Sequence, residues 1–228
     1  MTLTLIRHGQ SVWNRDNKFT GWVDVDLTEK GIAEAKQAGR LLLDENLLPD
    51  LVHTSLLKRA IHTSFLALQE LDRNWIPTYR SWRLNERHYG GLAGLDKDET
   101  IEKYGATKVL EWRRSYVLRP PQAEDTNQLR GDPRYLSIPS NELPLGESLK
   151  DVEARLNPYW INEIAPQIKS GLNVLIVAHG NSLRALVKRL EELGDEEVAS
   201  LEIPTGEPRV YEFDDNLNVT IKRILKVT

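Results

Sequence analysis

The chain has 228 residues, of which 40% are hydrophobic and 28% are charged, a composition that favours one globular domain. It contains no cysteine, which excludes disulfide frameworks, thiolate metal sites and thiol nucleophiles. Its 30 basic and 34 acidic residues give a net charge of −4, which argues against nucleic acid as the main partner.

The apolar segments are too short for a membrane span. The longest candidate, Val174 to Ala178, is far below the roughly 18 residues that a transmembrane helix needs. Residues 1–7 lack the basic, apolar and small-residue regions of a secretion signal. We therefore expect no membrane partner and a cytoplasmic location.

The first predicted elements are a short strand and an amphipathic helix. Residues 2–7 form an apolar strand that ends in Arg7-His8-Gly9. Thr28 can cap a helix that reaches Asp44. The residues that follow helical spacing along one apolar face of this helix are Ile32, Ala35, Gly39 and Leu42.

A second helix is predicted from Ser55, between weak strands at residues 51–53 and 76–79. Its apolar residues Leu57, Ile61, Phe65 and Leu68 are spaced as one stripe. Arg59 lies off this stripe, so we expect its guanidinium to be available for an anion at the helix start.

The second half of the chain predicts helices over 97–104, 107–116, 148–169 and 182–193, with Pro158 as a kink in the third. A buried strand over 173–178 ends in Ala178-His179-Gly180. Residues 209–213 and 218–225 alternate as a hairpin at a sheet edge.

The alternation of strands and helices predicts a three-layer α/β fold with a mostly parallel central sheet, flanking helices and an antiparallel edge near the C-terminus. We expect one domain over residues 1–228, with an irregular, proline-rich insertion at 117–146 that lines or covers the site. Ligands bind at the carboxyl ends of such strands, where His8 and His179 fall.

The two His-Gly pairs are candidates for chemistry. A histidine at a strand end beside Arg7 can attack phosphorus, because imidazole is largely neutral near pH 7. The alternative for His8 and for His179 is a histidine that only caps its strand. The context of both residues has to decide between these interpretations.

Several basic residues could surround the histidines. Arg7, Arg59, Lys97, Arg113 and Arg114 together would form a cationic pocket in a chain of negative net charge. Taken alone, each could be a solvated surface charge. No glycine-rich nucleotide-binding loop is present, so a small phosphorylated acid is the expected ligand.

A proton donor is also needed, and Glu86 is the best candidate carboxylate. The alternative interpretation of Glu86 is a surface glutamate that pairs with Arg87. No cluster of histidines or acidic residues has the spacing of metal ligands, so we expect no metal.

These residues lie in sequence blocks that resemble the cofactor-dependent phosphoglycerate mutases of the histidine phosphatase superfamily. The resemblance covers nearly the whole chain. The blocks are Arg7-His8-Gly9, Phe19-Thr20-Gly21-Trp22, Leu57 to Thr63, Leu84 to Gly90, Glu111 to Tyr116 and Ala178 to Leu186.

The resemblance implies that His8 becomes phosphorylated, that Glu86 donates and accepts the proton, and that His179 stabilises the transferring group with Arg7 and Arg59. It implies a substrate site that consists of Arg7, His8, Ser11, Asn14, Thr20, Gly21, Arg59, Glu86, Arg87, His88, Tyr89, Lys97, Arg113, Arg114, Gly180 and Asn181. The implied cofactor is 2,3-bisphosphoglycerate, and no metal is required.

The expected reaction is the interconversion of 2-phosphoglycerate and 3-phosphoglycerate in glycolysis and gluconeogenesis, by a protein that forms dimers or tetramers. The alternatives are a phosphatase that hydrolyses a small monoester or bisphosphoglycerate, and a non-catalytic module that binds a phosphorylated ligand. Many relatives carry a mobile tail beyond the hairpin, so the sequence leaves the balance of mutase and phosphatase activity open.

Overall fold

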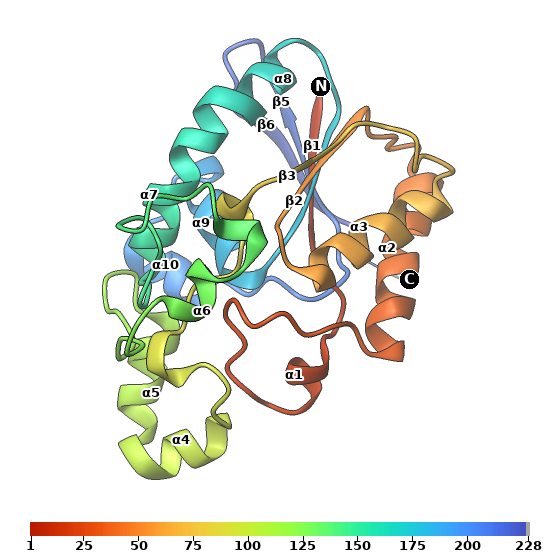
Figure 1. The fold of residues 1–228 in the computed structure, drawn as a ribbon. Coiled ribbons are helices and arrows are strands. Elements are labelled where there is room, and N and C mark those ends of the chain that lie inside the picture. The colour runs from red at the N-terminus through yellow and green to blue at the C-terminus, as the bar shows by residue number, and fades with distance from the viewer. Residues whose placement is uncertain (227–228) are drawn as a thin grey trace.

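The computed structural model describes residues 1–226 and has a six-stranded sheet with helices on both faces (Figure 1). The sheet order is β3-β2-β4-β1-β5-β6. The first four strands in this order are parallel, and β5 and β6 are antiparallel to their neighbours. The strands are β1 (Thr2–Arg7), β2 (Leu51–Thr54), β3 (Thr78–Arg80), β4 (Val174–Ala178), β5 (Arg209–Phe213) and β6 (Val219–Ile224).

Helices connect these strands and flank them. The α-helices are α1 (Val12–Arg15), α2 (Glu29–Asp44), α3 (Lys58–Glu70), α4 (Lys97–Tyr104), α5 (Ala106–Arg114), α6 (Asn127–Arg130), α7 (Leu149–Tyr159), α8 (Ala165–Lys169), α9 (Gly180–Leu190) and α10 (Asp195–Ser200). Short 3₁₀ turns cover Trp82–Leu84, Gly90–Leu92 and Pro133–Tyr135. The predicted three-layer α/β architecture is confirmed, including its antiparallel edge. No helix within residues 1–226 is long and apolar enough to cross a bilayer.

The central strands are apolar on both faces because helices cover both. Alternate residues of β4 face opposite layers: Ile176 packs with the cluster that includes α7 and α9, whereas Val177 packs with the cluster that includes α2 and α3. Such two-sided burial explains why Val174–Ala178 reads as a continuous apolar run. Figure 1 shows α1, α4 and α5 beyond the carboxyl end of β1.

The predicted apolar faces of the first two long helices are partly wrong. Ile32 is 40% exposed and Phe65 is 56% exposed, although both belong to the predicted apolar faces. α2 and α3 instead meet through small residues, since a Cβ on Gly39 would lie 2.4 Å from the carbonyl oxygen of Ala67. Arg59 lies in the first turn of α3 and is only 1% exposed, so its side chain lies inside the protein.

The helix expected over 148–169 has a different interruption from the one predicted. α7 continues past Pro158, and a π-helical turn over Trp160–Ile164 then joins it to α8. The helix expected from residue 182 begins earlier, at Gly180, directly after His179. This earlier start places His179 at the junction between β4 and α9.

Candidate active site

Two parallel strands bring the two predicted histidines together. The register of β1 and β4 pairs Arg7 with Ala178, so the residues that follow them lie at the same edge of the sheet. The backbone N–H of His8 donates to the carbonyl of Ala178 at 3.0 Å. The two imidazole rings have centroids 5.0 Å apart.

The glycine after His8 allows the chain to pack on the start of α2. A Cβ on Gly9 would lie 2.1 Å from the carbonyl oxygen of Gly31, which is closer than atoms can approach. The backbone N–H of Gly9 donates to Oγ1 of Thr63 at 3.1 Å. The Arg-His-Gly motif therefore reflects close packing as well as chemistry.

His8 is held as a neutral imidazole with one free nitrogen. Its Nδ1 is 2.7 Å from the carbonyl oxygen of Gly9, which requires Nδ1 to carry the proton and leaves a lone pair on Nε2. Burial, followed by the charges of Arg59 and Arg7, lowers the pKa of His8 well below 6.5, against an opposing effect of the Gly9 bond. A neutral imidazole that lines a cavity can act as a nucleophile.

His179 packs against His8 and is fully buried. Its Nε2 lies 2.7 Å from Oγ of Ser55. Its Nδ1 has no hydrogen-bond partner among residues 1–226. Burial and the charges of Arg59 and His8 lower the pKa of His179 well below 6.5.

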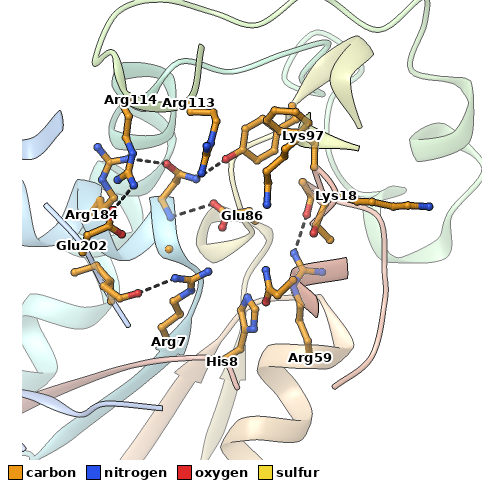
Figure 2. A pocket seen from close by; sticks show the side chains of 18 residues that line it. Arg7, His8, Lys18, Arg59, Glu86, Lys97, Arg113, Arg114, Arg184 and Glu202 are labelled. Carbon is orange, nitrogen blue, oxygen red and sulfur yellow. Dashed lines mark hydrogen bonds and ion pairs between the residues drawn. The ribbon is translucent and has the colours of Figure 1, made fainter. Parts of the chain in front are cut away.

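Two arginines flank His8, as Figure 2 shows. Arg7 donates from Nη1 to the carbonyl of Ile203 at 2.8 Å. Arg59 donates to the carbonyls of Val23 and Gly21 at 2.9 and 2.8 Å, and burial lowers its pKa to about 10. The Nε atoms of both arginines are buried without a partner in the described chain, so donors remain for an anion.

Glu86 enters the same cavity from the loop after β3, opposite His8 (Figure 2). One carboxylate oxygen, Oε1, accepts backbone N–H groups from Arg87 at 2.7 Å and Asn181 at 3.1 Å. The carbonyl of Glu86 accepts from the indole of Trp22 and from Nη2 of Arg155, at 2.5 and 3.0 Å. The first two contacts orient the carboxylate, and the last two hold the backbone that carries it.

The cavity is strongly cationic, with a volume of about 150 Å³. Seven basic residues line it, and they are Arg7, Lys18, Arg59, Lys97, Arg113, Arg114 and Arg184. Glu86 and Glu202 are the acidic residues in its lining. The remaining lining residues are His8, Asn14, Phe19, Thr20, Gly21, Tyr89, Gly180, Asn181 and Ile203. This excess of positive charge suits a small ligand with several negative charges.

Most of the residues expected at the site line this cavity, and the exceptions are Ser11, Arg87, His88 and His179. Ser11 caps α1 by accepting the backbone N–H of Asn14 at 3.2 Å. The Arg87 guanidinium lies 4.7 Å from the ring of Tyr89. His88 meets the ring of Trp22 edge-on, with centroids 5.7 Å apart. These three residues lie outside the cavity lining in this structure.

We expected residues 117–146 to line or cover the site. None of them lines the cavity, so the lining role is wrong, and the covering role stays a prediction. Tyr135, Ile138 and Leu143 instead pack behind it against Trp22. These three buried residues anchor a segment that has no helical or strand periodicity, whereas Leu136 is 70% exposed.

Three charged lining residues, Lys18, Arg184 and Glu202, were missed by sequence reasoning. Lys18 directly precedes the Phe-Thr-Gly-Trp block. Arg184 lies three residues after Asn181 on α9, a helical spacing that could have revealed it. Glu202 lies in an irregular segment with no local pattern that marks it. Within residues 1–226, no group of three or more histidine or acidic side chains could hold a metal ion.

Comparisons with known proteins agree with this geometry. The sequence pattern of the histidine phosphatase superfamily (branch 1) matches residues 3–132 and 122–224. A curated 2,3-bisphosphoglycerate-dependent phosphoglycerate mutase from Cutibacterium acnes is 60% identical over 217 residues, which are 94% of this chain and 87% of that protein.

Solved structures share the fold at lower identity. A mycobacterial glucosyl-3-phosphoglycerate phosphatase has a TM-score of 0.73 at 24% identity, over 98% of this chain and 96% of that one. A putative alpha-ribazole-5'-P phosphatase from Escherichia coli has a TM-score of 0.70 at 24% identity, over 100% and 97% of the two chains. The chain thus belongs to the histidine phosphatase superfamily (branch 1), in the family of 2,3-bisphosphoglycerate-dependent phosphoglycerate mutases.

Proposed function

We propose that this enzyme interconverts 2-phosphoglycerate and 3-phosphoglycerate through a phosphohistidine at His8. The observation that carries the proposal is a neutral His8 with a free Nε2 in a cavity lined by seven basic residues. A phosphoglycerate has a phosphate and a carboxylate, and such a ligand fits a cationic cavity in a chain of net charge −4. The similarity to a curated mutase supports the same substrate class.

The reaction starts from phospho-His8. The free hydroxyl oxygen of a bound phosphoglycerate attacks the phosphorus, the P–N bond to His8 breaks, and Glu86 takes the hydroxyl proton. The electron pair of that bond returns to Nε2. The lone pair of His8 then attacks the other phosphate of the ligand, and Glu86 returns the proton to the leaving oxygen. Phospho-His8 is restored and the isomer is released.

Positive groups around His8 stabilise the transferring phosphoryl group. Among residues 1–226, Arg7 and Arg59 each have a buried guanidinium nitrogen without a hydrogen-bond partner, and Nδ1 of His179 also has none. Asn14 also lines this cavity. We assign the far end of the substrate to Lys97, Arg113 and Arg114, with Thr20, Gly21, Tyr89, Gly180 and Asn181 along the wall and Ser11 behind it.

The first phosphoryl group has to come from a donor. When bound, 2,3-bisphosphoglycerate supplies the phosphoryl group that loads His8. The residues present fit this polyanion, because the cavity combines seven basic side chains with unpartnered guanidinium nitrogens. Arg7 and Arg59 would hold one phosphate, and Arg113, Arg114 and Lys97 the other.

The test compares isomerisation with hydrolysis. Turnover of 3-phosphoglycerate and release of inorganic phosphate are measured with and without 2,3-bisphosphoglycerate, in the presence of EDTA. We expect isomerisation that is stimulated by 2,3-bisphosphoglycerate, with little phosphate release. Rapid phosphate release without isomerisation identifies a phosphatase of the same fold, and no turnover of either kind favours a binding module.

A further inference from the structure

A cluster of three arginines lies at one end of the cavity, between α5 and α9. Arg114 and Arg184 line the cavity, and Arg87 is buried beside them. Arg184 is only 5% exposed. Burial, followed by the charges of Arg114 and Arg87, lowers the pKa of Arg184 to about 10, as expected when three guanidinium groups are neighbours.

Two of these arginines have no acidic partner in the described part of the chain. Arg184 donates to the carbonyls of Val198 and Ala199 and to Oδ1 of Asn181. Arg87 donates from Nη2 to the carbonyl of Arg113 at 3.0 Å, and its Nε and Nη1 are buried without a partner. Within residues 1–226, neither forms an ion pair with a carboxylate, so the cluster keeps an excess of positive charge.

The third arginine has a carboxylate partner from the segment after α10. Nη2 of Arg114 pairs with Oε1 of Glu202, which Figure 2 shows beside Arg114 and Arg184. The side chain of Glu202 is 67% exposed, whereas that of Arg114 is 28% exposed. Glu202 also lines the cavity, so the protein itself places a negative charge where the proposed function requires an anionic group of the substrate.

We propose that Glu202 is a specificity-determining residue that competes with the substrate for Arg114. In the free enzyme its carboxylate neutralises Arg114, and a ligand with a second anionic group has to displace it. A ligand with one anionic end binds beside His8 and leaves the pair intact. Glu202 therefore weakens the binding of two-ended ligands selectively, which favours product release. This inference rests on the proposed function.

The test uses two ligands that differ in the second anionic group. Dissociation constants of 3-phosphoglycerate and of glycerol 3-phosphate, which lacks the carboxylate, are measured by calorimetry on the unphosphorylated full chain and on Glu202→Gln. Because the pair is exposed, we expect 3-phosphoglycerate to bind about two- to fivefold more tightly to the variant. The constant for glycerol 3-phosphate should change much less, so the ratio of the two constants is the readout.

Glu207→Gln is the matched control. It removes the same charge from the same segment, where Glu207 pairs with Lys226 outside the cavity, and it should leave the ratio unchanged. The proposed competition is wrong if Glu202→Gln gains affinity equally for both ligands, or if it binds 3-phosphoglycerate no more tightly than the parent does. If the parent binds glycerol 3-phosphate and not 3-phosphoglycerate, the proposed function fails as well.

Discussion

The imidazole of His8 lies at 60° to that of His179, with the ring centroids 5.0 Å apart. Adjacent parallel strands end at this point, so the sheet itself sets the distance between the two rings. Arg7 and Arg59 add positive charge on the same side, and protonation of both rings here would bring four cations together. Both histidines are consequently neutral. This state suits His8 for attack on phosphorus and His179 for a hydrogen bond from Nδ1 to a phosphoryl oxygen.

This arrangement predicts a loss of stability in acid. Histidines of the unfolded chain bind protons below about pH 6.5, whereas His8 and His179 do so only at lower pH in the folded protein. Their contribution to the free energy of unfolding is complete above about pH 6.5. It is lost as the pH falls from there toward the lower pKa values of the folded protein. His8→Gln should reduce the slope of stability against pH by up to about 1.4 kcal/mol per unit.

Urea unfolding of the parent and of His8→Gln between about pH 5 and about pH 8 measures this slope. The exposed His62, replaced by glutamine, provides the control for loss of a histidine in general. If His8→Gln has the slope of the parent, His8 is protonated in the folded state and the argument for its neutral form is wrong.

Glu86→Gln tests the proton transfer. The amide oxygen of glutamine can still accept the N–H groups of Arg87 and Asn181, so substrate binding should persist. Glutamine cannot exchange a proton with the leaving oxygen, and we expect kcat to fall about 10²- to 10⁴-fold. Rapid-quench measurement of phosphoryl transfer in both directions checks this. An unchanged kcat would assign the proton to another group.

The loop that carries Glu86 depends on a buried ion pair. Nε of Arg155 lies 2.6 Å from Oε1 of Glu147, and their side chains are 7% and 5% exposed. Arg155→Ala leaves the carboxylate of Glu147 buried without its partner, so the free energy of unfolding should fall by about 3–5 kcal/mol. Arg40→Ala breaks the exposed pair with Glu70 and should cost less than about 1 kcal/mol. Urea unfolding measures both variants. If Arg155→Ala and Arg40→Ala lose similar free energies of unfolding, the loop does not depend on the buried pair.

Arg113 and Arg114 test whether the cavity has two anionic ends. Their replacement by alanine removes charge-assisted hydrogen bonds worth about 1.5–3 kcal/mol each, so the affinity for phosphoglycerate should fall by orders of magnitude. Hydrolysis of a monoester with one anionic end should be much less affected, because His8 and Glu86 remain. Both activities are measured on the same double variant, and equal losses would show that the pair supports the fold or the catalytic centre.

Sequence reasoning located the strand ends well because both signals are local. The apolar runs before His8 and His179 mark buried parallel strands, and such strands end at one edge of a sheet. It also anticipated that Thr28 caps a helix, and the hydroxyl of Thr28 accepts the N–H of Gly31 at 3.1 Å. Each inference required only a few neighbouring residues.

The errors concern contacts between distant segments. Phe65 is apolar and has helical spacing with the rest of its stripe, yet it is 56% exposed. At the contact of α2 with α3, Gly39 instead packs closely on the small residue Ala67. Glu202 contacts Arg114 across 88 residues of sequence. No periodic pattern in the sequence marks either contact, so only the folded structure reveals them.

The most direct test of the proposed mechanism is the intact mass of the protein after brief incubation with 2,3-bisphosphoglycerate. The parent should gain the mass of one phosphoryl group, since Nε2 of His8 is free to attack phosphorus. His8→Gln should gain none while it keeps the circular dichroism spectrum of the parent. A phosphorylated His8→Gln, or a parent that stays unmodified while it isomerises phosphoglycerate, would contradict covalent catalysis at His8.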